Sequence, residues 1–180
     1  GLLSFAIATG LFFGRFSRPR AYLKFSHNAL ISPYRNNQKA LMLRMAPHKN
    51  TQLTDAQAKI TLGMILEENG QMVNKFYSLD LELSEVNSLT LSWTLVHPIT
   101  ENSPLFGFTS DDFKSIDGEL IVYVKSFDDM YSTTVSVSTS YTFDEIVYGA
   151  KFEMMYSDSE DDSRTVLHLN KLNSFKEIQL

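Results

Sequence analysis

The sequence contains no cysteine, and this absence excludes two kinds of chemistry. No disulfide framework can form, and no thiolate is available as a nucleophile or as a ligand for a soft metal. The absence fits a reducing compartment without requiring one.

The motifs of common enzymes and cofactor sites are also missing. There is no GxSxG elbow, no P-loop and no GxGxxG. The acidic stretch "DSEDDS" has Ser163 where an EF-hand loop needs glycine, so it indicates a solvated hairpin tip. We therefore expect no enzyme activity, no cofactor and no bound metal. None of the histidines has a metal-ligand spacing such as HxxxH; they are His27, His48, His97 and His168.

The overall charge and size set further bounds. A formal net charge of −5 at pH 7 argues against a general nucleic-acid binder. The 180 residues, of which 43% are hydrophobic, are enough for one domain with a buried core.

Charge is absent from residues 1–13, and Arg15, Arg18 and Arg20 follow closely. As a helix this apolar stretch spans roughly 20 Å, which is short of the roughly 30 Å hydrocarbon core. A secretory signal would carry its basic residues before the apolar run, and a soluble amphipathic helix would be more polar. The favoured interpretation is the inner half of a transmembrane helix that begins upstream of Gly1. Basic residues just past a span mark the cytoplasmic side.

Pro19 supports a helix exit at this point, because it has no N–H to continue a helix. Two roles remain open for the three nearby arginines. They either fix the membrane topology alone or also bind anionic lipid phosphates, which a planar guanidinium recognises well.

The remainder of the chain alternates apolar and polar residues with a period of two, which predicts β-strands. Turn signals separate the segments, and helical turns are expected only after Thr109 and after Thr142, where "TFDE" resembles a capping box. Many short strands with regular turns predict a mainly β protein with an immunoglobulin-like antiparallel β-sandwich. The expected strands are Leu41–Met45, Ala56–Leu66, Leu79–Leu83, Leu89–Val96, Glu119–Val124, Thr133–Ser138, Ala150–Tyr156 and Thr165–Leu169.

Two long motifs stand out, and the first is "WTLVHPITENSPLFGFTSDDF" (residues 93–113). It resembles the form "hVHxIDExSPLYxxxxxDL" of the inward-rectifier potassium channel family. "ELIVYVKSFDDMYSTTVSVSTSYTFDEIVYGAKF" (residues 119–152) is similar to "EIVVxxxGxxExxxxxxxxRSSYxxxEIxWGxxF". "RFSRPRAYLKFSHNALI" and "LMLRMA" look like the helix exit and the first two strands, and the short linker between Pro19 and Phe25 resembles the bacterial members.

The resemblance implies a domain organisation and a function. Residues 1–16 would be the end of the pore-lining inner transmembrane helix, residues 17–24 a basic linker, and residues 25–180 the cytoplasmic β-sandwich domain. The whole would form a homotetramer in the bacterial cell membrane, with this domain on the cytoplasmic side. K⁺ would pass through an acidic cytoplasmic vestibule, anionic lipid would gate the channel at the membrane interface, and Mg²⁺ or polyamines would act as blockers.

The same resemblance assigns roles to individual residues. It implies that Asp129 is a pore-facing acid, which fourfold symmetry would turn into a ring of carboxylates. Met130, Thr133 and Thr134 belong to the segment, Met130 to Ser138, that would narrow the cytoplasmic pore. Lipid-binding roles fall on Arg15, Arg18 and Arg20, and the inner-helix gate falls on Gly10, Phe12 and Phe13.

Some family features are absent, and they keep a second hypothesis open. Phe5 occupies a position that is acidic in strong rectifiers, and Glu68 or Asn69 lies near the expected place of another cytoplasmic acid. No TxGYG selectivity filter occurs in the sequence. The alternative is a membrane-tethered β-sandwich that binds a ligand or a protein and conducts no ions.

Overall fold

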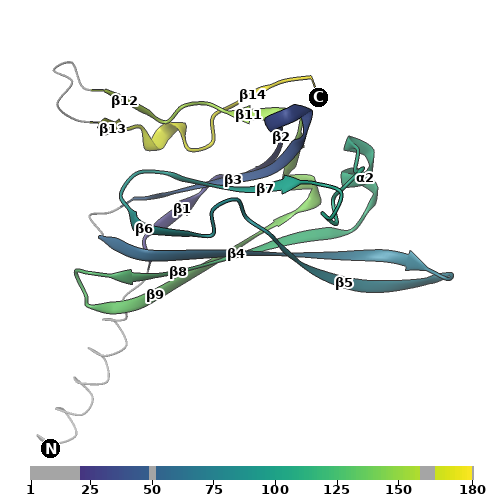
Figure 1. Cartoon of the computed structure of the whole chain (residues 1–180), viewed down its shortest axis with the longest axis horizontal. Coiled ribbons are helices and arrows are strands. Elements are labelled where there is room, and N and C mark those ends of the chain that lie inside the picture. The colour runs from purple at the N-terminus through teal and green to yellow at the C-terminus, as the bar shows by residue number, and fades with distance from the viewer. Residues whose placement is uncertain (1–20, 49–51, 159–164, 180) are drawn as a thin grey trace, which may run out of the picture.

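The computed structural model describes residues 21–48, 52–158 and 165–179. In these residues the chain folds into two five-stranded sheets that face each other, with two small two-stranded sheets outside them (Figure 1). The predicted β-sandwich is therefore confirmed.

Sheet A is organised around β3. β3 pairs with β1, β2 and β7, all antiparallel, whereas β10 joins β2 in parallel. Its strands are β1 (Leu23–Phe25), β2 (Ala29–Pro33), β3 (Lys39–Pro47), β7 (Trp93–Ile99) and β10 (Ile146–Tyr148).

Sheet B is antiparallel throughout and is organised around two long central strands, β4 and β8. In the order β5-β4-β8-β9, with β6 pairing the start of β4, it forms the lower layer of Figure 1. Its strands are β4 (Leu53–Glu68), β5 (Gln71–Leu79), β6 (Glu85–Leu89), β8 (Gly118–Asp128) and β9 (Thr133–Thr142).

The C-terminal part of the chain forms two small two-stranded sheets on the side of sheet A away from sheet B (Figure 1). β11 (Ala150–Phe152) pairs with β14 (Phe175–Glu177), and β12 (Tyr156–Asp158) pairs with β13 (Thr165–Leu167). A separate small core beneath them joins β3 to this layer through Ala46, Met155 and Leu172. The short helices are η1 (Arg35–Asn37), α2 (Ser110–Ser115), η2 (Phe143–Glu145) and η3 (Leu169–Lys171).

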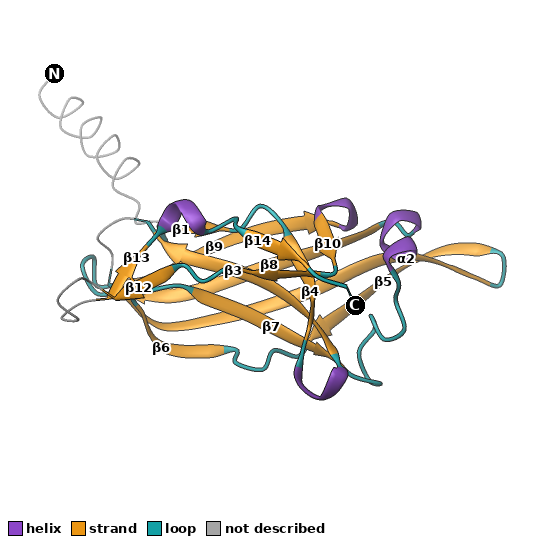
Figure 2. Ribbon diagram, turned by 90° about the horizontal axis from the view of Figure 1, so that it is seen from above, coloured by secondary structure: helices purple, strands orange, loops and turns teal. Residues whose placement is uncertain are grey.

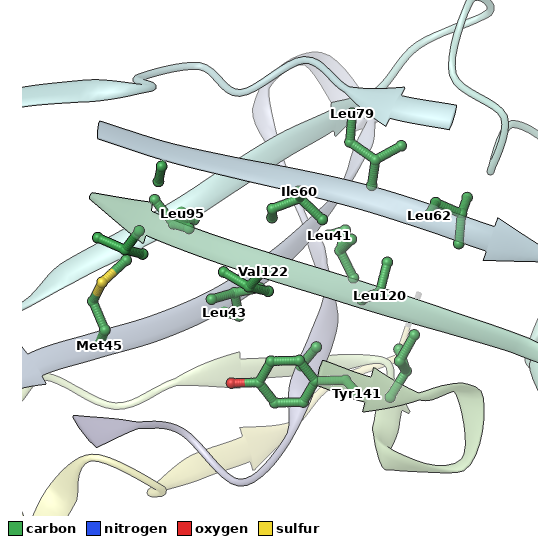
Figure 3. Close-up of a cluster of buried hydrophobic side chains, with 14 of the residues drawn as sticks. Leu41, Leu43, Met45, Ile60, Leu62, Leu79, Leu95, Leu120, Val122 and Tyr141 are labelled. Carbon is green, nitrogen blue, oxygen red and sulfur yellow. The ribbon is translucent and has the colours of Figure 1, made fainter. Parts of the chain in front are cut away.

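The main core lies between the two sheets because each long strand places every second side chain inward. β8 buries Leu120, Val122 and Val124 while Ile121 and Tyr123 point outward. Figure 3 shows the inward side chains of both sheets meeting. Each fully buried aliphatic side chain stabilises the fold by about 1.5–3 kcal/mol. The alternation thus fixes which face of sheet B is exposed.

Tyr141 on β9 adds a polar connection inside this core. Its hydroxyl donates a hydrogen bond of 2.7 Å to the Ser26 carbonyl oxygen, between β1 and β2. Burial raises the pKa of Tyr141 to about 12, so the hydroxyl stays protonated and remains a donor.

Four predicted strands were wrong in their bounds; one of them, Thr165–Leu169, ends as a strand at Leu167, and Leu169 begins η3. Leu79 ends β5, and the following residues are not a strand. They pass between the two sheets and hydrogen-bond to both: Glu82 N–H donates to the Val96 carbonyl oxygen of β7, and the Ser84 carbonyl oxygen accepts from Ala58 N–H of β4. The segment 89–96 is divided by a bend into β6 and β7, and 150–156 is divided into β11 and β12.

The two predicted helical turns are confirmed. α2 follows Thr109, whose N–H and hydroxyl both donate to the Asp112 carboxylate. η2 follows Thr142, whose N–H donates to Glu145 at 3.0 Å. Both are capping boxes, in which a side chain satisfies a backbone donor left free at a helix start.

Candidate functional site

The turn between β8 and β9 contains two of the residues singled out from the sequence, Asp129 and Met130. It runs from Asp129 to Ser132 and is closed by the pairing of Asp128 with Thr133. The Met130 side chain is 59% exposed. Ser132 has a φ of 48°, a left-handed conformation that costs a non-glycine residue of order 1 kcal/mol or more. The turn therefore needs contacts that hold it in place.

The start of β4 holds Asp129 from the exposed side. The Asp129 N–H donates to the Gln52 carbonyl oxygen at 3.0 Å, and the Thr54 hydroxyl donates to Asp129 Oδ1 at 3.2 Å. The side chain is exposed. Its carboxylate thus lies on the surface at one end of sheet B and is available to cations.

Asp55 is a second exposed acid at this end, and the sequence did not single it out. The pairing of β4 with β8 shifts between Thr54 and Gln57, and Asp55 at this bulge has a φ of 47°. A bulge bends a strand and turns a side chain away from the regular alternation. The sequence held a signal, since an aspartate directly precedes the alternating stretch that starts at Ala56.

Glu68, near the expected place of another cytoplasmic acid, lies at the far end of β4 from Asp129. Glu68 pairs with Gln71 at the tip of the β4–β5 hairpin, whereas Leu53 at the other end of β4 pairs with Asp128. Figure 2 shows this hairpin projecting beyond the rest of the domain. Glu68 also forms an ion pair with Lys75. It is therefore remote from Asp129 and does not belong to the same site.

The exposed face of sheet B continues from Asp129 along β8. Lys125 lies opposite Gln57 on β4, and Tyr123 lies opposite Lys59. Lys59 and Lys125 are thus diagonal neighbours on one face, a spacing of about 7–8 Å. In the described part of the chain neither lysine forms an ion pair. A cationic zone therefore lies next to the acidic end.

The segment expected to narrow the pore is mostly strand. Thr133 and Thr134 begin β9 and pair with Asp128 and Phe127 of β8. Thr134 is exposed and Thr133 half-buried. Only residues 129–132 form a turn, so the segment is a tight hairpin rather than a loop running to Ser138. The lipid-binding and gate residues expected from the sequence lie outside the described residues: Arg15, Arg18, Arg20, Gly10, Phe12 and Phe13.

His97, in the first of the two motifs, is an internal structural residue. Its Nδ1 lies 2.7 Å from the Asp80 carbonyl oxygen, and its Nε2 lies 2.8 Å from the Ser103 hydroxyl. Because a carbonyl only accepts, Nδ1 carries the proton and the Ser103 hydroxyl donates to Nε2. Burial lowers the pKa of His97, which favours this neutral form.

Arg44, in the "LMLRMA" stretch, joins β3 to the C-terminal layer. Its guanidinium donates to carbonyl oxygens of Glu153, Lys171 and Leu172 at 2.6–3.2 Å and lies 4.4 Å from the Phe152 ring centroid. Burial lowers the pKa of Arg44 to about 10, so it remains charged at neutral pH. Arg44 thus adds hydrogen bonds to the apolar contacts that hold the last part of the domain on β3.

The described ranges hold no group of three or more histidine, cysteine, aspartate or glutamate residues that could bind a metal ion. No helix within them is long and apolar enough to cross a membrane.

A match over nearly the whole described domain decides its family. A family model described as "Inward rectifier potassium channel C-terminal domain" matches residues 23–180. The chain belongs to the inward rectifier potassium channel family. This family consists of ion channels, not enzymes.

Individual relatives agree with this assignment. The chain is 29% identical over 174 residues to the inward rectifier potassium channel Kirbac3.1 of Paramagnetospirillum magnetotacticum, covering 96% of this chain and 58% of the relative. It is 26% identical over 153 residues to ATP-sensitive inward rectifier potassium channel 12 of Gallus gallus, covering 80% and 35%. With irk-1 of Caenorhabditis elegans it shares 24% identity over 163 residues, covering 86% and 30%. The chain spans 58% or less of these relatives' own lengths.

Proposed function

We propose that this domain is the cytoplasmic gating and ion-pathway part of a homotetrameric inward-rectifier potassium channel. The observation that carries the proposal is the placement of Asp129 and Asp55, two exposed acids at one end of sheet B beside the β8–β9 turn. In a fourfold assembly around this end, each acid becomes a ring of four carboxylates. Such rings concentrate K⁺ and bind multivalent cations.

The turn itself supports a narrowing of the pathway beside the acids. It is short, it is closed by the pairing of Asp128 with Thr133, and it carries the exposed side chains of Met130 and Tyr131. Residues 1–16 would supply the end of the pore-lining helix, and residues 17–24 the basic linker. Arg15, Arg18 and Arg20 would then bind anionic lipid at the membrane surface and couple it to gating.

Block of K⁺ current in the full-length channel tests this function. Asp129→Asn and Asp55→Asn should each weaken block by Mg²⁺ or spermine, because each removes four charges from the pathway. Glu68→Gln is the matched control, since Glu68 lies at the far end of β4 and should leave block unchanged. If block in Asp129→Asn and Asp55→Asn is as strong as in the unsubstituted channel and in Glu68→Gln, this end of sheet B lies outside the ion pathway.

A further inference from the structure

Asp128, the neighbour of Asp129, lies on the opposite face of β8 and is completely buried. The inward row of β8 is apolar from Leu120 to Val124 and then ends in Ser126 and Asp128. Ser126 uses its hydroxyl to donate to the Thr54 carbonyl oxygen at 2.7 Å. Burying a carboxyl group is costly unless it makes compensating hydrogen bonds. The hydrogen bonds of Asp128 therefore indicate the role of this buried carboxyl group.

One oxygen of Asp128 holds the turn. Oδ1 accepts hydrogen bonds from the N–H groups of Met130 at 2.9 Å and Tyr131 at 3.3 Å. Met130 is 59% exposed and Tyr131 is 58% exposed. The carboxyl group thus reaches from the interior to the backbone of an exposed turn, as aspartate does in Asx-turns.

The other oxygen makes no such contribution. Asp128 Oδ2 is buried and has no hydrogen-bond partner among the described residues. An unpaired buried polar atom lowers stability. A valine at this position would continue the apolar inward row of β8 and remove the unpaired oxygen, but it would also remove the acceptor of the Met130 and Tyr131 N–H groups.

We propose that Asp128 is a positioning residue for the β8–β9 turn, fixing the place of the Asp129 carboxylate and the Met130 side chain. The turn is fastened on its buried side by Asp128 and on its exposed side by Gln52 and Thr54. Ser132, with its left-handed backbone, remains in place because the turn is held from both sides. The consequence for ion passage rests on the proposed function.

Amide hydrogen exchange in the full-length protein tests the positioning directly. Asp128→Val should speed exchange of the Met130 and Tyr131 amides by about tenfold or more without lowering the melting temperature. Asp128→Asn keeps the Oδ1 acceptor and should retain slow exchange. Val124→Ala is the control for general destabilisation, since it should lower the melting temperature and leave these two amides protected relative to the rest of β8. If Asp128→Val does not fold, Asp128→Ala takes its place.

Two results would overturn the positioning role: unchanged exchange in Asp128→Val, or equal exchange in the valine and asparagine variants. Block by Mg²⁺ then separates the two proposals. Weaker block in Asp128→Val but not in Asp128→Asn supports the role of the turn in the pathway. Fast exchange in Asp128→Val with unchanged block in both Asp128→Val and Asp129→Asn supports the positioning and contradicts the proposed function.

Discussion

The Thr54 hydroxyl donates a hydrogen bond to Asp129 Oδ1 at 3.2 Å, which connects the start of β4 to the turn between β8 and β9. On the same side, the Gln52 carbonyl oxygen accepts the Asp129 N–H. The exposed acid is thus held by a strand that is distant in sequence. A carboxylate held in this way has a defined direction, which a ring of charges around a pathway requires.

Lysines on the exposed face of sheet B should weaken block by multivalent cations. Lys125 lies four residues before Asp129 on β8, about 13 Å along the strand. Lys125→Gln in the full-length channel is expected to strengthen Mg²⁺ or spermine block about twofold or more, because four positive charges leave the pathway. The measurement is the concentration that halves outward K⁺ current. Lys151→Gln, on β11 in the outer layer, is the control, and equal behaviour of the two variants would place Lys125 outside the pathway.

Arg44 should be essential for the C-terminal layer. Arg44→Met removes the donors to the carbonyls of Glu153, Lys171 and Leu172, and we expect a loss of about 2–4 kcal/mol of unfolding free energy. Limited proteolysis should then cleave the chain between residues 153 and 178 first. Lys24→Met removes an exposed cation from β1 and should change neither result. Resistance of the Arg44 variant to proteolysis would show that the C-terminal layer is held by other contacts.

His97 should make stability depend on pH in the acidic range. Its pKa is lowered in the folded state because burial disfavours the charged ring, so the unfolded chain binds more protons below about pH 6.5. The contribution is therefore complete above about pH 6.5 and declines as the pH falls toward the folded-state pKa, by at most about 1.4 kcal/mol per pH unit. Melting curves from pH 5 to 8 should show a flatter dependence for His97→Gln than for the unchanged protein. Parallel curves would mean that His97 is not the titrating group.

The basic linker should bind anionic lipid. Arg18→Gln with Arg20→Gln in the full-length protein is expected to reduce binding to liposomes that contain phosphatidylglycerol, with the difference shrinking at high salt. Arg35→Gln is the control, because Arg35 belongs to the folded domain and pairs with Glu82 at 3.0 Å. Unchanged binding of the double variant would eliminate the lipid-sensing role.

The sequence predicted the long strands well because their alternation is strong. β4 and β8 each bury every second residue over most of their lengths, as the apolar periodicity predicted. The prediction failed at residues 79–83, where the same alternation of leucines occurs in a segment that passes between the sheets. Local pattern does not distinguish a strand from such a crossing.

The candidate site was only partly predictable. Asp129 followed from the family motif, and the alternation of β8 would also have placed Asp128 inward. The role of Asp55 depends on a bulge, which arises from pairing with a distant strand and leaves little trace in the sequence. The hydrogen bonds that the Met130 and Tyr131 N–H groups donate to Asp128 likewise depend on the geometry of the turn and could not be predicted from the sequence.

The most direct test of the central claim is the accessibility of position 129 to the ion pathway. This chain has no cysteine, so Asp129→Cys gives it a single thiol. In the full-length channel in liposomes, a positively charged thiol reagent should reduce the K⁺ flux of the Asp129→Cys variant. A negatively charged reagent, applied separately, should raise that flux by restoring the lost negative charge. Spermine should slow both reactions. Complete modification by both reagents with no change in K⁺ flux would contradict the placement of this domain around the pathway.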